Sequence, residues 1–124
     1  MSTAITILTV LVVEDDQLVR MHGIGVLEEA GFQVIEADNA DVALEILDRG
    51  VPVTLLLSDI AMPGSMDGLE LVRVVHERWP SVRLLLTSGH HRLMEGEAPE
   101  AVRFVRKPWN SESLVGHVRE LVNS

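Results

Sequence analysis

Short apolar runs recur along the chain, and each is followed by a stretch in which apolar residues are spaced for a helix. The runs are rich in leucine, valine and isoleucine and contain few polar residues, which is typical of strands buried on both faces of a sheet. The sequence therefore predicts five strands, at residues 7–13, 32–37, 53–58, 83–88 and 102–107.

The segments between these strands carry signals for the ends of helices. Asn39 and Asn110 are candidate N-caps of the second and last helices, because a short polar side chain can accept a hydrogen bond from the first helical turn. Gly31 and Gly50 stand where a glycine is favoured just past a helix end, and Pro80 ends the third helix. Strands and helices that alternate in this way predict a parallel sheet with helices on both faces, a doubly wound (βα)5 fold.

The segment after the fourth strand departs from this regular pattern. Residues 89–101 contain Gly96 and Pro99, which interrupt any long helix. We therefore expect a short or irregular fourth helix, or a loop, at this point.

Length and composition narrow the class of protein. The chain has 124 residues, of which 47% are hydrophobic, so it can bury one core of its own and fits a single domain of about 100 to 150 residues. A formal net charge of −9 disfavours binding to nucleic acid and to anionic membranes.

Composition and the N-terminal pattern also indicate the cellular compartment of the protein. The chain has no cysteine, which is compatible with a reducing environment and excludes disulfides and thiolate metal sites. The apolar stretch near the N-terminus meets three acidic residues well before the about 20 residues that a membrane span needs. We expect a cytoplasmic protein.

Polar residues follow the apolar strands at corresponding points. Glu14 and Asp15 follow the first strand, Asp59 the third, Thr87 lies at the end of the fourth, and Lys107 at the end of the fifth. The carboxyl ends of parallel strands meet at one edge of a sheet, where ligands of such folds bind. These five side chains are therefore candidates for one site.

Their chemistry suits a hard metal ion and a phosphoryl group. If the first and third strands are neighbours, the carboxylates of Glu14, Asp15 and Asp59 crowd together and need a compensating cation. Oxygen ligands without histidine or cysteine favour Mg²⁺. Lys107 supplies a positive point charge and Thr87 a hydroxyl, so Asp59 can act as a nucleophile toward phosphorus and form an aspartyl phosphate.

Four segments at the strand ends carry the motifs of a known family. They read VLVVEDD (10–16), LLLSDIAMPGSMDGLEL (55–71), LLLTSG (84–89) and FVRKPW (104–109). In this order they resemble the receiver (CheY-like) domain of two-component response regulators. The resemblance implies one receiver domain over residues 1–124, of the single-domain (stand-alone) type, with a flavodoxin-like fold and strand order 2-1-3-4-5.

The resemblance also implies a phosphoacceptor signalling function. Asp59 would receive a phosphoryl group from a histidine kinase or phosphotransfer protein, and the phosphorylated chain would switch its binding to a downstream protein target, as a monomer or weak homodimer. The implied Mg²⁺ ligands are Glu14, Asp15, Asp59 and the backbone carbonyl of Ala61. The chain would be no enzyme beyond its own phosphorylation and dephosphorylation.

Further residues receive a switching role from the same resemblance. Thr87 would move to the phosphoryl group and Lys107 would pair with it. Phe104 stands where the family has a switching aromatic, although by its pattern alone it is equally a core residue. The peptide bond before Pro108 would be cis. The loop at residues 62–68 has one residue more than the family's usual M-P-x-M-D-G.

Alternative interpretations remain for the chain and for single residues. One is a pseudo-receiver that binds a partner without being phosphorylated. Another is an aspartyl-nucleophile phosphatase of the haloacid dehalogenase kind, but Ala61 stands where such enzymes carry a second aspartate. Asp16 suits a helix cap as well as a metal. Trp79 and Trp109 are interpreted as packing or surface cover, with Trp109 close enough to Lys107 to report on the site by fluorescence.

Overall fold

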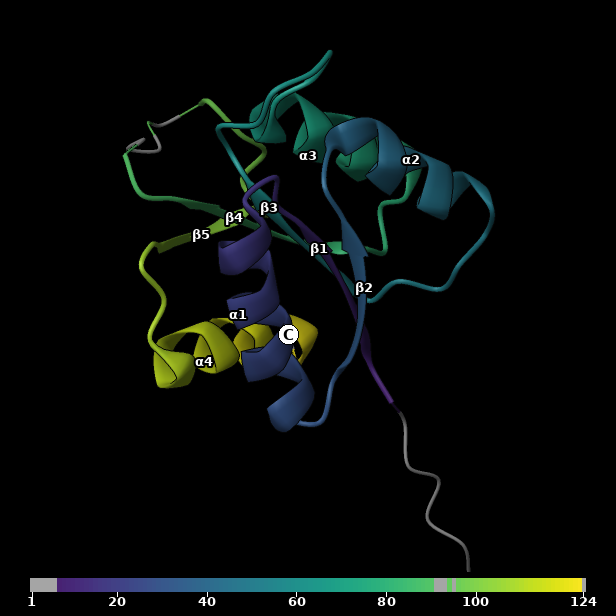
Figure 1. The fold of residues 1–124 in the computed structure, drawn as a ribbon. Coiled ribbons are helices and arrows are strands. Elements are labelled where there is room, and N and C mark those ends of the chain that lie inside the picture. The colour runs from purple at the N-terminus through teal and green to yellow at the C-terminus, as the bar shows by residue number, and fades with distance from the viewer. Residues whose placement is uncertain (1–6, 91–93, 95, 124) are drawn as a thin grey trace, which may run out of the picture.

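Five parallel strands form a single sheet at the centre of the molecule (Figure 1). The computed structural model describes residues 7–90, 94 and 96–123. The strands are β1 (Thr9–Val13), β2 (Gln33–Ala37), β3 (Leu55–Asp59), β4 (Arg83–Ser88) and β5 (Arg103–Arg106). Their order in the sheet is β2-β1-β3-β4-β5, which confirms the predicted order.

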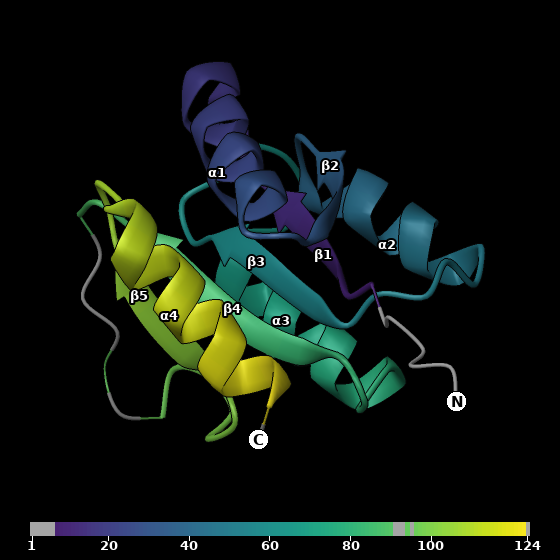
Figure 2. The same cartoon turned by 90° about the horizontal axis from the view of Figure 1, so that it is seen from below.

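Helices cover both faces of this sheet. They are α1 (Gln17–Glu29), α2 (Ala40–Asp48), α3 (Gly68–Arg78) and α4 (Ser111–Val122). Helices α1 and α4 lie on one face, and α2 and α3 lie on the other (Figures 1 and 2). The doubly wound (βα)5 architecture is therefore confirmed. No helix among the described residues is long and apolar enough to cross a membrane.

The predicted helix ends are also confirmed. The side-chain oxygen of Asn39 accepts a hydrogen bond from the backbone N–H of Val42 at 2.9 Å, and that of Asn110 accepts one from Ser113 at 3.0 Å. Gly31 and Gly50 follow α1 and α2 with φ values of 96° and 81°, in the left-handed region that favours glycine. These local signals mark the starts of α2 and α4 and the ends of α1 and α2.

The central strand β3 is buried over its whole length and divides the core in two. Leu55 and Leu57 pack on the side of α1 and α4, whereas Leu56 packs on the side of α2 and α3. Because successive side chains of a strand point to opposite faces, a strand covered on both sides needs apolar residues throughout. This burial holds the last residue of β3, Asp59, in a fixed place.

The segment between β4 and β5 agrees with the expectation of an interrupted helix. Its described residues form turns and bends, and Gly96 has a φ of 86°. Residues 91–93 and 95 lie outside the described residues. The segment remains attached to the sheet face, because Ala98 and Val102 pack against the core beside α2 and α3.

Candidate functional site

The register of the sheet brings the predicted site residues to one edge. In the ladder between β1 and β3, Val13 pairs with Ser58, so Glu14 and Asp59 follow directly at the ends of neighbouring strands. Asp59 in turn pairs with Thr87 of β4. The backbone N–H of Lys107, just after β5, donates to the carbonyl of Ser88 at 3.1 Å.

Three carboxylates meet at this edge. Glu14, Asp15 and Asp59 each offer an oxygen, and these oxygens lie within 4.8 Å of one another. Glu14 and Asp59 are buried, whereas Asp15 is exposed. The donors are all carboxylate oxygens and the cluster is open on one side, so it fits a hard divalent cation that keeps some of its water. Ala61, two residues after Asp59, is exposed beside the site.

Lys107 lies between two of these carboxylates. Its ammonium group forms an ion pair with Glu14 and lies 3.3 Å from Oδ2 of Asp59. Burial alone would lower the pKa of Lys107, but the hydrogen bond to Glu14 and the charges of both carboxylates raise it above its ordinary value. The lysine therefore remains a cation inside the site.

Glu14 is the most buried of the three acids, with 1% of its surface exposed. Burial raises the pKa of its carboxyl above 4.5. The hydrogen bonds from Lys107 and from the backbone N–H of Asp16 act in the opposite direction, and the charge of Asp59 adds to the increase. The site thus holds negative charge at a cost in free energy that a bound cation would reduce.

Asp16 caps a helix, which is one of the two roles that the sequence allowed, the other being a metal ligand. Its Oδ1 accepts hydrogen bonds from the backbone N–H groups of Leu18 and Val19 at 2.9 and 3.1 Å. These are the free donors of the first turn of α1. These bonds make Asp16 the N-cap of α1, and Asp16 is not among the three acids whose oxygens cluster at the site, so the structure favours the capping interpretation.

Trp109 has a contact that the sequence did not predict. Its indole N–H donates to the hydroxyl oxygen of Thr87 at 2.9 Å, and both residues are buried. The two residues are 22 positions apart, and a tryptophan after a lysine and a proline carries no local signal for such a bond. The buried position of Trp109 in the core beside α1 and α4 confirms the packing alternative of its interpretation.

Phe104 packs on the other face of the sheet. It lies against the core beside α2 and α3, whereas its neighbour Val105, which pairs with Thr87, belongs to the core beside α1 and α4. The ring of Phe104 is partly buried. The peptide bond between Lys107 and Pro108 is cis.

The start of α3 approaches the site very closely. The backbone N–H of Gly68 donates to the carbonyl of Ile60 at 2.9 Å, and a Cβ on Gly68 would lie 2.0 Å from the carbonyl oxygen of Asp59. Only glycine fits there. Asp67 and Glu70 form a reciprocal capping box at the same helix start, which gives Asp67 a structural role.

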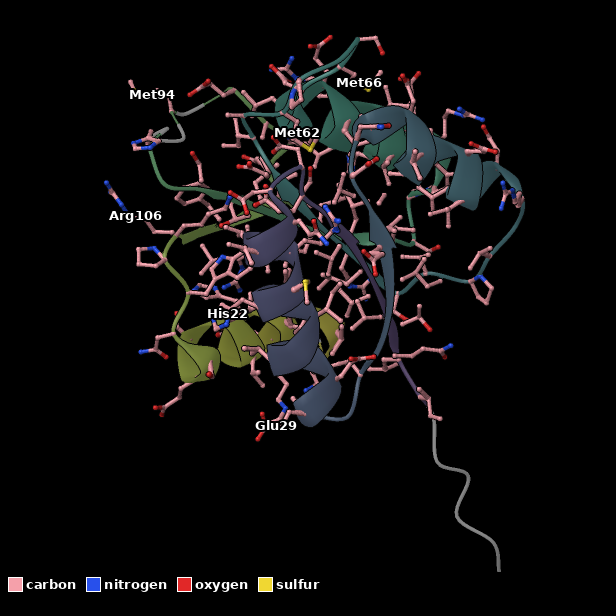
Figure 3. The ribbon with its side chains drawn as sticks, in the orientation of Figure 1. His22, Glu29, Met62, Met66, Met94 and Arg106 are labelled. Atoms are coloured by element: carbon pink, nitrogen blue, oxygen red, sulfur yellow. The ribbon has the colours of Figure 1, made fainter. Side chains whose placement is uncertain are left out.

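The loop with the additional residue is anchored to α2. Gly64 has a φ of 109°, and the hydroxyl of Ser65 donates to a carboxylate oxygen of Asp41 at 3.1 Å. Met62 and Met66 lie in this loop and pack against the core beside α2 and α3 (Figure 3). The additional residue is thus accommodated in the loop, and Asp59 is paired with Thr87 in the sheet.

Comparison with known proteins gives the family. The model of the response regulator receiver domain matches residues 10–119, and the chain belongs to this family. It is 33% identical to the response regulator receiver protein CpdR of Brucella abortus, over 91% of this chain and 95% of that protein. It is 34% identical to the sensor kinase CckA of the same organism, over 92% of this chain but only 12% of the kinase.

Solved structures agree with the fold. A response regulator receiver protein from Sinorhizobium medicae superposes with a TM-score of 0.89 at 26% identity, over 95% of this chain and 96% of that one. The receiver domain of the hybrid histidine kinase CckA gives a TM-score of 0.79 at 28% identity, over 92% and 98%. Among longer relatives the chain spans only a part, such as 24% of an NtrX-like regulator of Rickettsia bellii. The chain is a flavodoxin-like receiver domain and a phosphoacceptor of two-component signalling.

Proposed function

We propose that Asp59 is the phosphoacceptor and that it takes the phosphoryl group from a phosphohistidine of a kinase or phosphotransfer protein. The observation that carries this proposal is the position of Lys107, whose ammonium group lies 3.3 Å from Oδ2 of Asp59 in a cluster with two further carboxylates. A buried carboxylate with a cation beside it is held ready for attack on an incoming phosphorus atom.

The bond-making step takes place between Asp59 and the phosphodonor. A carboxylate oxygen of Asp59 forms a bond to phosphorus while the bond from phosphorus to the donor's histidine nitrogen breaks, and the nitrogen keeps the electron pair. Lys107 neutralises charge on the transferring oxygens, which is the main source of catalysis in phosphoryl transfer. The hydroxyl of Thr87 donates to a phosphoryl oxygen once the group is bound.

The carboxylates of Glu14, Asp15 and Asp59 and the backbone carbonyl of Ala61 would hold Mg²⁺. When bound, the ion would supply positive charge in addition to that of Lys107. The exposed Asp15 would bind the ion, and the buried Glu14 would also keep Lys107 in place through their ion pair.

The output is a change in protein binding. The phosphoryl group favours one of two arrangements of the site loops, and a downstream protein binds that arrangement more tightly. A catalytic cycle on free substrates is not proposed, because Ala61 leaves the site without the second aspartate that an aspartyl phosphatase would use as its acid. The CpdR and CckA relatives support a kinase phosphorelay as the source of phosphate.

The test is incubation with acetyl phosphate and Mg²⁺, read by intact mass. The wild type should gain one phosphoryl group, and Asp59→Asn should gain none. Asp67→Asn is the matched control, because asparagine caps a helix as well as aspartate does, and it should gain the group as the wild type does. A wild type that gains no mass with acetyl phosphate or with a phosphorylated kinase is a pseudo-receiver, and the proposal fails.

A further inference from the structure

We propose that Trp109 is a positioning residue that holds the Thr87 hydroxyl away from the phosphoryl site until Asp59 is phosphorylated. This inference rests on the proposed function, because it assigns a free-energy cost to the movement of Thr87 toward a phosphoryl group on Asp59. The observation behind it is the hydrogen bond from the indole N–H of Trp109 to Oγ1 of Thr87, at 2.9 Å in a buried setting.

The indole is held firmly where it makes this bond. Trp109 is only 7% exposed. Its ring lies over Gly23 of α1, where a Cβ would be 2.6 Å from Cζ3 of the indole. The ring of His22 stacks on the indole with a centroid distance of 6.3 Å and an interplanar angle of 14°, and Figure 3 shows His22 on the side of α1 toward the segment between β5 and α4. A larger residue at position 23 would displace the indole.

The faces of the sheet make Trp109 the aromatic residue that is coupled to Thr87. Thr87 pairs with Val105, whose side chain packs on the α1 and α4 side together with Trp109. Phe104 packs on the α2 and α3 side. The aromatic residue with a polar bond to the Thr87 hydroxyl is therefore Trp109, from the loop after β5.

The bond sets an energetic preference between two positions of the threonine. An indole can only donate, and its N–H has Thr87 as its partner in a site with little access to water. When Thr87 moves to the phosphoryl group, this N–H loses its acceptor, and a buried donor without an acceptor is costly. The arrangement that binds the phosphoryl group is thereby less populated, which lowers the apparent affinity for any ligand that requires it.

The experiment measures the affinity for beryllofluoride, a phosphoryl mimic, in the presence of Mg²⁺. Trp109→Phe keeps an aromatic ring and removes the N–H, and it should bind beryllofluoride about threefold to tenfold more tightly, the gain expected from releasing one neutral hydrogen bond. Trp79→Phe is the matched control, because Trp79 ends α3 and stacks under Arg78. Its affinity should equal that of the wild type.

The same substitution in a Thr87→Val background distinguishes a positioning role of Trp109 from a packing role. In Thr87→Val the hydroxyl is absent, so adding Trp109→Phe should change the affinity by less than about twofold. An equal gain in both backgrounds would assign Trp109 a packing role and overturn the inference. An affinity of Trp109→Phe equal to or weaker than that of the wild type would also overturn it, the weaker result meaning that the indole instead prepares Thr87 to donate.

The indole itself gives an independent signal. In the Trp79→Phe chain the fluorescence comes from Trp109 alone, and its emission should shift when beryllofluoride and Mg²⁺ saturate the protein. An unchanged emission under saturation would contradict the loss of the bond. A wild type that binds no beryllofluoride would instead contradict the proposed function, so the two failures are distinguishable.

Discussion

The two ends of the sheet place their charges in opposite ways. At the carboxyl end, some charged and polar side chains are buried, and the buried polar residues of the described part of the chain are Glu14, Ser58, Asp59, Thr87 and Ser88. At the amino end, the ion pairs are exposed. Arg103, which begins β5, pairs with Glu120 at 3.3 Å, and 48% and 64% of the two side chains are exposed.

This difference distinguishes buried charges that serve a function from exposed charges that hardly change the free energy of unfolding. Exposed pairs change the free energy of unfolding little, because water screens them. Buried carboxylates are costly unless a cation or hydrogen bonds compensate them. In the proposed function the carboxyl end accepts that cost because it would bind a phosphoryl group and a cation, so substitutions should have large effects at that end and small ones at the other.

The largest effect is expected where the backbone itself is crowded. Gly68→Ala places a methyl group 2.0 Å from the Asp59 carbonyl, and it should lower the free energy of unfolding by about 3 kcal/mol or more. Gly116→Ala in α4 is the control, because nothing lies within 4 Å of its Cβ position, and it should raise stability by about 0.5 to 1 kcal/mol. Urea unfolding measures both, and a mild effect at Gly68 would show that the start of α3 can shift.

The next effect concerns Lys107 as the cation of the site. Lys107→Met keeps most of the apolar stem and removes the charge, and it should slow phosphorylation by acetyl phosphate about a hundredfold. Arg106→Met is the control, since Arg106 is exposed and points away from the molecule (Figure 3), and its rate should stay within about twofold of the wild type. Equal rates for the two variants would remove Lys107 from the chemistry.

A smaller effect, with a pH dependence, is expected at Glu14. Because the folded state raises the pKa of this carboxyl above 4.5, the fold binds its proton more tightly than the unfolded chain does, and wild-type stability falls as pH rises through that raised value. Glu14→Gln has no such loss. Without Mg²⁺ it should be more stable than the wild type at pH 7, and the difference should vanish below pH 4.5.

Urea titrations at the two pH values in the presence of a chelator measure this difference. Glu45→Gln, in the exposed pair with Arg49, is the control and should show no such gain. A Glu14→Gln variant that is less stable than the wild type at pH 7 would mean that the ion pair with Lys107 outweighs the cost of burial.

The smallest effect is expected at the amino end. Arg103→Ala removes the exposed pair with Glu120 and should change the free energy of unfolding by about 0.5 kcal/mol or less. Phosphorylation by acetyl phosphate should be unchanged. A loss above about 1 kcal/mol would mean that charge at the two ends of the sheet is not as different as their burial indicates.

Much of the site at the carboxyl end of the sheet could be predicted from the sequence, because the signals for it are local. A strand buried on both faces must be apolar throughout, so a carboxylate such as Asp59 at its end is conspicuous. Helix caps at Asn39 and Asn110 depend on residues three positions apart, which a sequence shows directly. The parallel topology then brings the strand ends to one edge, and so the amino-acid pattern alone was enough to group Glu14, Asp59, Thr87 and Lys107.

The tertiary structure alone decided the contacts between distant segments. The side chain of Asp16 suits both a metal ligand and a helix cap, and only its hydrogen bonds to the α1 backbone distinguish the two roles. The crowding between Gly68 and Asp59 depends on how closely α3 approaches a strand end. The bond from Trp109 to Thr87 depends on which face of the sheet each residue occupies. Periodicity determines elements, whereas such contacts arise from packing between elements, which no local pattern encodes.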